Sequence, residues 1–154
     1  MYESDSRIVL TLDAGGTNLV FSAMAANREI VTPVHFPSCP DDLDRMLSTL
    51  VEGFESVRRQ LPAAPAAVSF AFPGPADYAN GVIGDLPNFP SFRGGVALGP
   101  YLERHFGVPV FINNDGNLFA YGEAISGALP EVNALLEAGG ASWRCRNLLG
   151  ITLG

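Results

Sequence analysis

Residues 7–18 read RIVLTLDAGGTN, and this stretch decides the fold. The run at 7–13 is β-branched and leucine-rich and stops at the pair Gly15 and Gly16, which is typical of a buried strand followed by a sharp turn. Two more strand-like runs follow closely, NLVFSAM at 18–24 and EIVTPVHF at 29–36. The linkers are too short for helices, so the sequence predicts an antiparallel meander of three strands.

An amphipathic helix is predicted after the meander. Apolar side chains recur at spacings of three and four residues, which places them on one stripe. Asp42 at the start and Arg58 at the end match capping and helix-dipole preferences. The stripe consists of Leu43, Met46, Leu47, Leu50, Val51, Phe54 and Val57.

Strands and helices alternate through the rest of the chain. Asn80 and Gly81 favour a small hairpin within a long loop, and Gly107 is expected to close a helix. Asn114 or Asp115 can cap the helix after the last buried strand. In order, the predicted elements are strand 67–72, loop 76–95, helix 98–106, strand 108–113, a helix up to Ile125, a weak helix near 131–138 and a strand from 147 onward.

This order predicts an α/β domain with a mixed sheet of about five strands and flanking helices. The length of 154 residues and the 47% hydrophobic content fit one globular domain. In such sheets, ligands gather at the carboxyl ends of the parallel strands. That rule selects Asp13, Gly74, Asn114 and Asp115.

Composition excludes several functions. The net charge is -7, and all nine basic residues are arginine, so there is no lysine for a Schiff base or a Walker-type phosphate loop. The arginines are scattered, which argues against nucleic acid, and the acidic balance disfavours an anionic membrane. Cys39 and Cys145 are expected to be ordinary thiols. The acidic N-terminus and the lack of a long apolar stretch predict a soluble cytoplasmic protein.

The turn 13–18 is the first candidate site. Successive amides in a glycine turn can hold phosphate oxygens, and Thr17 adds a hydroxyl donor. Asp13 would repel a phosphate unless a divalent cation lies between them, which is how magnesium is usually held. The alternative is an ordinary tight hairpin with a solvated aspartate.

The segment after the strand 108–113 is the second candidate site. Asp115 is placed to accept a proton from a substrate hydroxyl, and Asn114 can donate to and accept from sugar hydroxyls. Asp115 as a mere helix cap is the alternative, although a helix N-terminus also stabilises an ionised carboxylate.

A third candidate is the loop 85–92, which reads DLPNFPSF. Asn88, held between prolines, could present an amide to a sugar while nearby aromatics offer a flat wall to its ring. Equally, Phe89 and Phe92 could seal the loop onto the core.

Together these segments resemble the ROK family, whose name joins repressor, open reading frame and kinase. The resemblance rests on DAGGTN after the first strand, FPGP after the fourth, PNFPSF in the loop and NNDGNLFAYGE after the fifth. The family contains glucokinases and related hexose kinases of the actin, hexokinase and heat-shock-chaperone ATPase superfamily. The resemblance therefore implies a ribonuclease-H-like domain and ATP-dependent phosphorylation of a hexose or amino-hexose.

It also implies roles for single residues. Asp115 would be the catalytic base, and the sugar would contact Gly74, Asn88 and Asn114 as well as Asp115. Asp13 would serve Mg²⁺. The turn residues assigned to the ATP phosphates are Asp13, Gly15, Gly16, Thr17 and Asn18.

The chain departs from the family pattern in places. Asn113 and Phe92 stand where the family usually has glutamate and tryptophan, which leaves the sugar preference open, and residues 127–146 look longer than usual. Residues 152–154 look like the opening of a second glycine-rich phosphate segment. Residues 1–154 are therefore expected to be the N-terminal sugar and phosphate domain of a two-domain kinase, inactive without the C-terminal ATP-binding domain.

Two other functions remain open. One is a sugar-sensing transcription regulator of the same family, although only 12 residues precede Asp13, too few for a helix-turn-helix. The other is a nucleotide-dependent interaction module resembling actin. The expected partners are a small sugar and the missing C-terminal domain, without nucleic acid or membrane, and a homodimer is one option for the oligomeric state.

Overall fold

The computed structural model describes residues 3–151. The chain divides into two compact units, one ending at Asn113 and the other beginning at Asn114, where composition suggested a single domain. The first unit contains a layered sheet and helices, and the second contains two helices and an extended segment.

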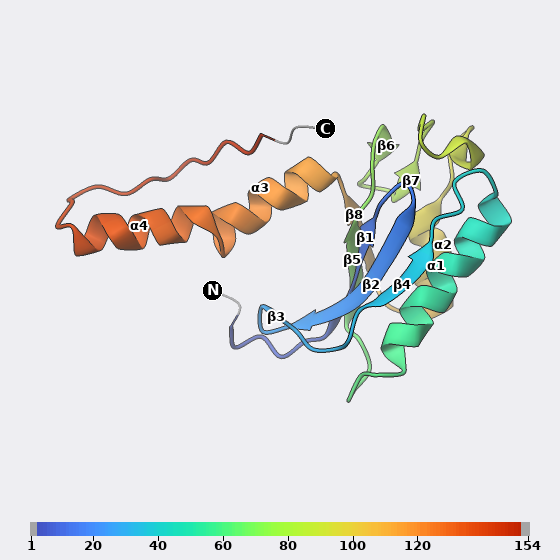
Figure 1. Cartoon of the computed structure of the whole chain (residues 1–154), viewed down its shortest axis with the longest axis horizontal. Coiled ribbons are helices and arrows are strands. Elements are labelled where there is room, and N and C mark those ends of the chain that lie inside the picture. Colours follow the sequence, from blue (N-terminus) through green and yellow to red (C-terminus); the bar gives the residue numbers. More distant parts are fainter. Residues whose placement is uncertain (1–2, 152–154) are drawn as a thin grey trace. The chain divides into compact units, whose positions relative to one another are not determined.

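The first unit is built on a mixed sheet (Figure 1). Three of its strands run parallel: β1 (Val9–Ala14), β5 (Ala67–Ala71) and, at the edge of the sheet, β8 (Val110–Asn113). β2 (Asn18–Ala25) pairs antiparallel with β1. β3 (Arg28–Glu29) and β4 (Val34–Pro37) both pair with β2, so the sheet order is β3-β2-β1-β5-β8 with β4 also at the β2 edge. The predicted α/β fold with an antiparallel meander is confirmed.

The third strand of the meander is split, which the sequence did not predict. The predicted run 29–36 becomes β3 and β4, interrupted at residues 30–33. Pro33 has no N–H to donate to a ladder. Within the gap, the backbone of Thr32 pairs instead with the side chain of Gln60, at 3.2 Å for each of the two bonds.

Two helices cover one face of the sheet (Figure 1). They are α1 (Leu43–Arg58) and α2 (Leu98–Phe106). Asp42 caps α1 by accepting from the N–H of Arg45, and Gly107 closes α2 in the left-handed region at φ 67°. Both predicted helices are confirmed. Their apolar stripes pack on alternate residues of β1, β2 and β5 in one core. Within it, the ring of Phe54 in α1 packs edge-on against the ring of Phe21 in β2, with ring centroids 5.0 Å apart.

The loop after β5 has local order. The predicted hairpin around Asn80 and Gly81 is present as β6 (Ala76–Asp77) and β7 (Val82–Ile83). A short 3-10 helix, η1 (Pro90–Phe92), follows, and the loop is pinned to the core by buried Leu86, Phe89 and Phe92.

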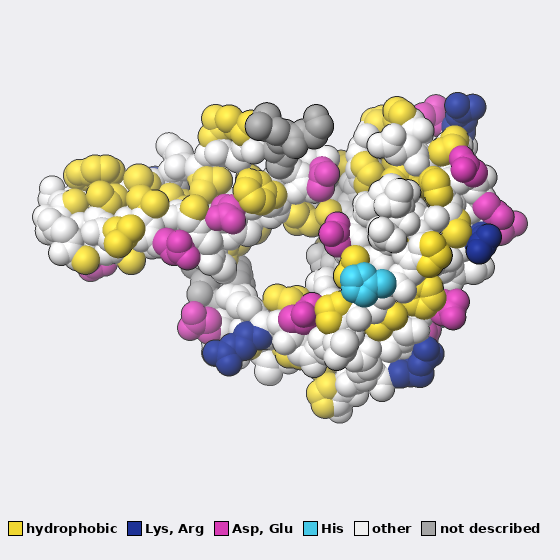
Figure 2. Space-filling view, in the orientation of Figure 1, with side chains coloured by type: hydrophobic (Ala, Val, Ile, Leu, Met, Phe, Trp, Pro, Cys, Tyr) yellow, Lys and Arg dark blue, Asp and Glu magenta, His cyan; other side chains and the backbone are white. Residues whose placement is uncertain are grey.

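The second unit consists of α3 (Asp115–Ile125), α4 (Ala128–Ala138) and the segment up to residue 151. Neither helix has a buried residue, and apolar side chains gather on the visible surface of this unit (Figure 2). Asn133 of α4 clamps the chain: its Oδ1 accepts from the N–H of Cys145 at 2.7 Å, and its Nδ2 donates to the oxygen of Cys145 at 2.9 Å.

The predicted last strand is wrong over residues 147–151, which belong to no strand in the described structure. A strand exists only where another strand supplies ladder hydrogen bonds, and none of the described strands pairs with this segment. Residues 152–154, expected to open a second phosphate segment, lie outside the described residues.

Candidate functional site

The candidate site lies at the carboxyl edge of the parallel strands. β1 ends at Ala14, β5 at Ala71 and β8 at Asn113. The register pairs Leu12 with Phe70, and Ala71 with Asn113. The residue after Leu12 is Asp13, so Asp13 lies level with Ala71 and Asn113 on neighbouring strands. The parallel arrangement thus brings the ends of β1, β5 and β8 to one sheet edge.

The turn 13–18 is a tight hairpin whose two glycines do different work. Gly15 donates its N–H to the oxygen of Asn18 at 2.9 Å, and a Cβ on Gly15 would lie 2.9 Å from that same oxygen. The hairpin therefore requires a glycine at position 15, and the N–H of Gly15 is not available to a ligand because it donates to Asn18. A Cβ on Gly16 would meet nothing within 4 Å. The packing of the fold therefore does not require a glycine at position 16, and the open space there leaves room for a ligand to approach the backbone.

Asp13 and Thr17 are exposed beside Gly16. The carboxylate of Asp13 forms no hydrogen bond or ion pair with another described residue. Thr17 Oγ1 accepts weakly from Asn18 Nδ2 at 3.4 Å. The N–H groups of Gly16 and Thr17 donate to no other residue in the range 3–151. The turn therefore presents one carboxylate, one hydroxyl and two amides to solvent.

These donors and acceptors fit a magnesium nucleotide. Magnesium is usually held by one or two carboxylates together with substrate phosphates, so a single exposed Asp13 suffices, and open space over Gly16 accommodates phosphate oxygens. Among the described side chains, no three His, Cys, Asp or Glu residues cluster as a metal cage. The turn is suited to a metal that arrives with its ligand.

Asn88 stands at the tip of a preformed loop. Residues 86–89 form a β-turn closed by the Phe89 N–H on the Leu86 oxygen at 3.2 Å, with Pro87 and Asn88 at its corners. The Asn88 side chain is exposed. At the base of the loop, Asp85 Oδ1 accepts from the N–H of Gly94 at 2.7 Å. The loop presents the Asn88 amide in a fixed place.

The aromatic residues of this loop are core residues and form no wall for a sugar. Phe89 is 1% exposed and Phe92 is fully buried. Their ring centroids lie 5.2 and 5.4 Å from that of Phe72. The structure therefore decides between the two interpretations of these phenylalanines: they seal the loop onto the core.

Gly74 follows β5 at the same edge. A Cβ there would lie 2.9 Å from the hydroxyl oxygen of Tyr78, which donates to the oxygen of Phe72 at 2.9 Å. Tyr78 thus holds the backbone after β5 in place and requires a glycine. Neither Tyr78 nor Asp85 was selected from the sequence, because each acts through a partner that only the folded loop identifies.

Asn114 and Asp115 belong to the second unit. Asn114 is the N-cap of α3, since its Oδ1 accepts from the N–H of Asn117 at 3.2 Å. Asp115 is the first residue of the helix, is exposed, and accepts from the N–H of Gly116 at 2.9 Å. The interpretation of Asp115 as merely a cap is wrong, because Asn114 does that work.

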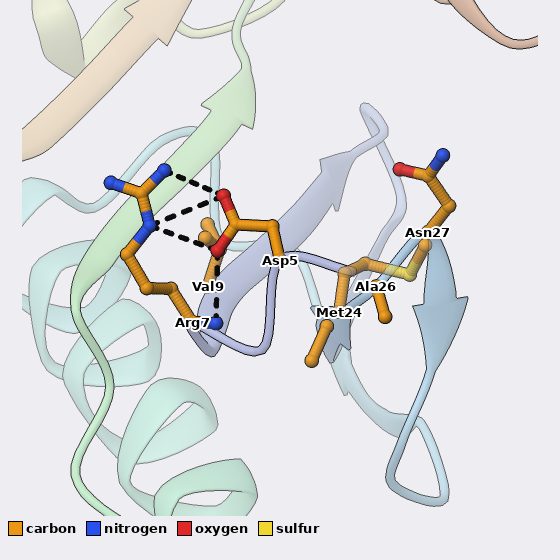
Figure 3. A pocket seen from close by; sticks show the side chains of 7 residues that line it. Asp5, Arg7, Val9, Met24, Ala26 and Asn27 are labelled. Atoms are coloured by element: carbon orange, nitrogen blue, oxygen red, sulfur yellow. Dashed lines mark hydrogen bonds and ion pairs between the residues drawn. The ribbon is translucent and has the colours of Figure 1, made fainter. Parts of the chain in front are cut away.

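A separate pocket of about 230 Å³ opens where β1 begins and β2 ends (Figure 3). Arg7 Nε and Nη2 donate to Asp5 at 2.9 and 2.6 Å, and these hydrogen bonds lower the pKa of Asp5 to about 2. The pocket is also lined by Val9, Met24 and Asn27. None of the predicted site residues lines it.

No helix within residues 3–151 is both long enough and apolar enough to cross a membrane. Cys39 and Cys145 are free thiols, as expected.

Comparison with known proteins identifies relatives over most of the chain. A crystal structure of a glucokinase from Parabacteroides distasonis is 65% identical, with a TM-score of 0.85, and the match covers 94% of this chain and 41% of that one. An N-acetyl-D-glucosamine kinase from Photobacterium profundum is 31% identical over 112 residues, 73% of this chain and 36% of the relative. The DNA-binding transcriptional repressor Mlc from Escherichia coli is 31% identical over 86 residues, 56% of this chain and 21% of the repressor.

The chain thus spans about two fifths or less of the length of these relatives. The glucokinase structure shares the fold of this chain, the actin-like ATPase fold, in agreement with the ribonuclease-H-like expectation. The model of the ROK family matches residues 9–138, which include the turn, the loop and the start of α3. The chain belongs to the ROK family.

Proposed function

We propose that this chain is the N-terminal part of a longer sugar kinase that transfers the γ-phosphoryl group of ATP to a hydroxyl of a hexose or amino-hexose. The observation that carries the proposal is the turn 13–18, where an exposed carboxylate and an open Gly16 face solvent at the same sheet edge as the Asn88 loop. Family membership supports it, because sugar kinases are among the relatives.

Each proposed residue has a defined task. Gly74, Asn88 and Asn114 would hold the sugar through hydrogen bonds that also orient its acceptor hydroxyl. Asp115 would take the proton of that hydroxyl as the oxygen forms its bond to phosphorus and the bond to the ADP oxygen breaks. Asp115 stands in the first turn of α3, where the helix dipole interacts favourably with a negatively charged side chain.

The turn would serve the phosphates. Asp13 would hold Mg²⁺, which neutralises charge on the phosphate oxygens when it is bound. The amides of Gly16 and Thr17 and the Thr17 hydroxyl would bind phosphate oxygens, and Gly15 and Asn18 close the hairpin that presents them. Phosphoryl transfer requires mainly that the reacting atoms are aligned and that the phosphate charge is neutralised. The groups of the turn would therefore be the contribution of this chain to phosphate binding.

The test is Asp115→Asn in the complete protein, assayed for sugar phosphorylation. Removal of the base should lower kcat by about 100- to 10,000-fold while circular dichroism remains unchanged. Asp44→Asn, an exposed aspartate in the first turn of α1, is the control and should leave the rate unchanged. Unchanged turnover in Asp115→Asn would rule out this residue as the base. The 154-residue chain alone should not turn over, because the proposed second lobe closes the site.

A sugar-responsive repressor is the second candidate, favoured by the similarity to Mlc. The net charge of -7 and the lack of any lysine argue against DNA contact by these residues. Two measurements on the complete protein separate the two functions. A kinase converts ATP to ADP when sugar is added. A repressor binds operator DNA, and added sugar releases it from that DNA.

A further inference from the structure

Residues 37–40 join the two elements at the candidate site. At one end, Ser38 donates its N–H to the oxygen of Thr17 in the turn 13–18 at 2.9 Å. At the other end, the oxygen of Pro40 accepts from the N–H of Ser91 in the loop 85–92 at 3.2 Å. We call this segment the strap. It forms a direct backbone connection between the turn and the loop, which are more than 60 residues apart in the chain.

The strap is stiff for reasons in its sequence. It reads PSCP, so a proline at each end fixes φ and also restricts the residue before it. It is anchored on both sides, because β4 leads into it and α1 begins just after it. Asp42 ties the strap to the helix by donating its N–H to the oxygen of Cys39 at 3.3 Å and capping α1.

The strap also carries one of two buried hydroxyl groups at its ends. The hydroxyl oxygens of Ser38 and Ser91 are buried, and neither has a hydrogen-bond partner among the described residues. A buried hydroxyl without a partner is unfavourable, and native proteins usually avoid it. Both hydroxyls belong to the residues whose N–H groups form the two backbone hydrogen bonds of the strap, so solvent is excluded beside each of these bonds.

We propose that the strap is a positioning element that fixes the distance between the phosphate turn and the sugar loop. This inference rests on the proposed function, because it assigns the turn to the phosphoryl donor and the loop to the acceptor. Transfer requires the reacting atoms to lie about 3–3.5 Å apart, and a displacement of about 1 Å can lower the rate about 100-fold. Loosening the strap should therefore impair alignment more than it impairs binding at either subsite.

The first test needs no ligand. In the double variant Pro37→Gly/Pro40→Gly, the strap gains backbone freedom while its hydrogen-bonding groups remain. Hydrogen exchange of the 154-residue chain, followed by NMR, should show the amides of Ser38 and Ser91 exchanging about tenfold faster or more, while amides of β1 and β5 are unchanged. Pro62→Gly, an exposed proline in the loop before β5, is the matched control and should change neither amide.

Exchange rates of Ser38 and Ser91 within about twofold of the parent would overturn the proposal. If the double variant loses its native circular dichroism, Pro40→Ala, which frees the same φ angle with less added chain entropy, should show a smaller increase at the same two amides, and no increase would overturn the proposal equally.

The second test measures alignment in the complete protein. The double variant should lower kcat by about 10- to 100-fold, with sugar and nucleotide affinities within about threefold and a binding stoichiometry equal to that of the parent. The stoichiometry excludes a misfolded fraction as the cause. Unchanged kcat, or a rise in the KM for sugar alone, would overturn the positioning role. A parent protein that phosphorylates no sugar would contradict the proposed function, and the exchange experiment would still decide whether the strap holds the turn and the loop together.

Discussion

Phe89 packs against Phe72 with ring centroids 5.2 Å apart, and this contact attaches the Asn88 loop to the end of β5. Phe89 is 1% exposed although its neighbour Asn88 lies at the surface. Of these two neighbours in the turn, Phe89 is therefore buried in the core, whereas Asn88, just before it, is presented to solvent. The loop is a fixed part of the fold.

Phe89→Ala should consequently lower the free energy of unfolding by roughly 3–5 kcal/mol, because it leaves a cavity beneath the loop. Denaturant unfolding of the 154-residue chain measures this. Phe111→Ala is the control: Phe111 is 60% exposed, so its loss should change stability by less than about 0.5 kcal/mol. Asn88→Ala should likewise change the free energy of unfolding by less than about 0.5 kcal/mol. Equal losses for Phe89 and Phe111 would contradict the anchoring role.

Substitution by alanine should affect stability at Gly15 and ligand binding at Gly16. Gly15→Ala places a Cβ 2.9 Å from the oxygen of Asn18, so we expect a loss of about 1–3 kcal/mol of stability. Gly16→Ala meets nothing within 4 Å and should leave stability within about 0.5 kcal/mol. Its expected effect is on ligand: in the complete protein, the affinity for magnesium nucleotide should fall. Unchanged nucleotide affinity in Gly16→Ala would contradict the role of the turn.

Local patterns in the sequence predicted most of the first unit. Short apolar runs located β1, β2, β5 and β8, because a buried strand needs little beyond its own side chains to be recognised. Strands that depend on a distant partner were less predictable. The run from 147 onward has the residue types of a strand but no described strand to pair with, and the run 29–36 is broken where Thr32 bonds to Gln60.

The candidate site divides in the same way. Asp13, Gly16 and Asn88 were selected because motif and strand end coincide. The distinction between Gly15 and Gly16, and that between Asn114 and Asp115 as cap, each depend on one hydrogen bond of the folded turn. The contact of Ser91 with Pro40 joins positions about 50 residues apart, and no local pattern could reveal it.

In the β6–β7 hairpin, hydrogen bonds from Asn80 should make the stability depend on the protonation of Asp77. The side-chain amide of Asn80 donates to Asp77 at 2.7 Å, and its backbone N–H donates at 3.2 Å, so the pKa of Asp77 lies below its ordinary value of 3.8. Asn80→Ala removes the larger contribution and should raise the pKa of Asp77 toward 3.8. Carboxyl NMR titration measures the shift, and an unchanged midpoint would contradict the role of the Asn80 side chain.

The sign of the linked stability follows. Because the pKa of Asp77 is lowered in the folded state, its hydrogen bonds favour folding above the unfolded pKa, and this benefit is lost as the pH falls through the folded pKa. The difference in stability between the parent and Asn80→Ala should therefore be present at pH 6 and shrink as the solution is acidified below pH 3.8.

Gly53 of α1 faces the ring of Phe21 on β2, and a Cβ at Gly53 would overlap that ring. In an open helix, replacing glycine with alanine stabilises by up to about 1 kcal/mol, because alanine restricts the unfolded chain and favours the helix. At Gly53 the overlap with Phe21 should reverse the sign and destabilise by about 1–3 kcal/mol. Gly122 in α3 is the matched control, since a Cβ there meets nothing within 4 Å. Gly122→Ala should raise the helicity of the second unit, as seen by circular dichroism. Stabilisation by Gly53→Ala in denaturant unfolding would show that α1 can move away from the sheet, contrary to the close packing on which the position of the strap depends.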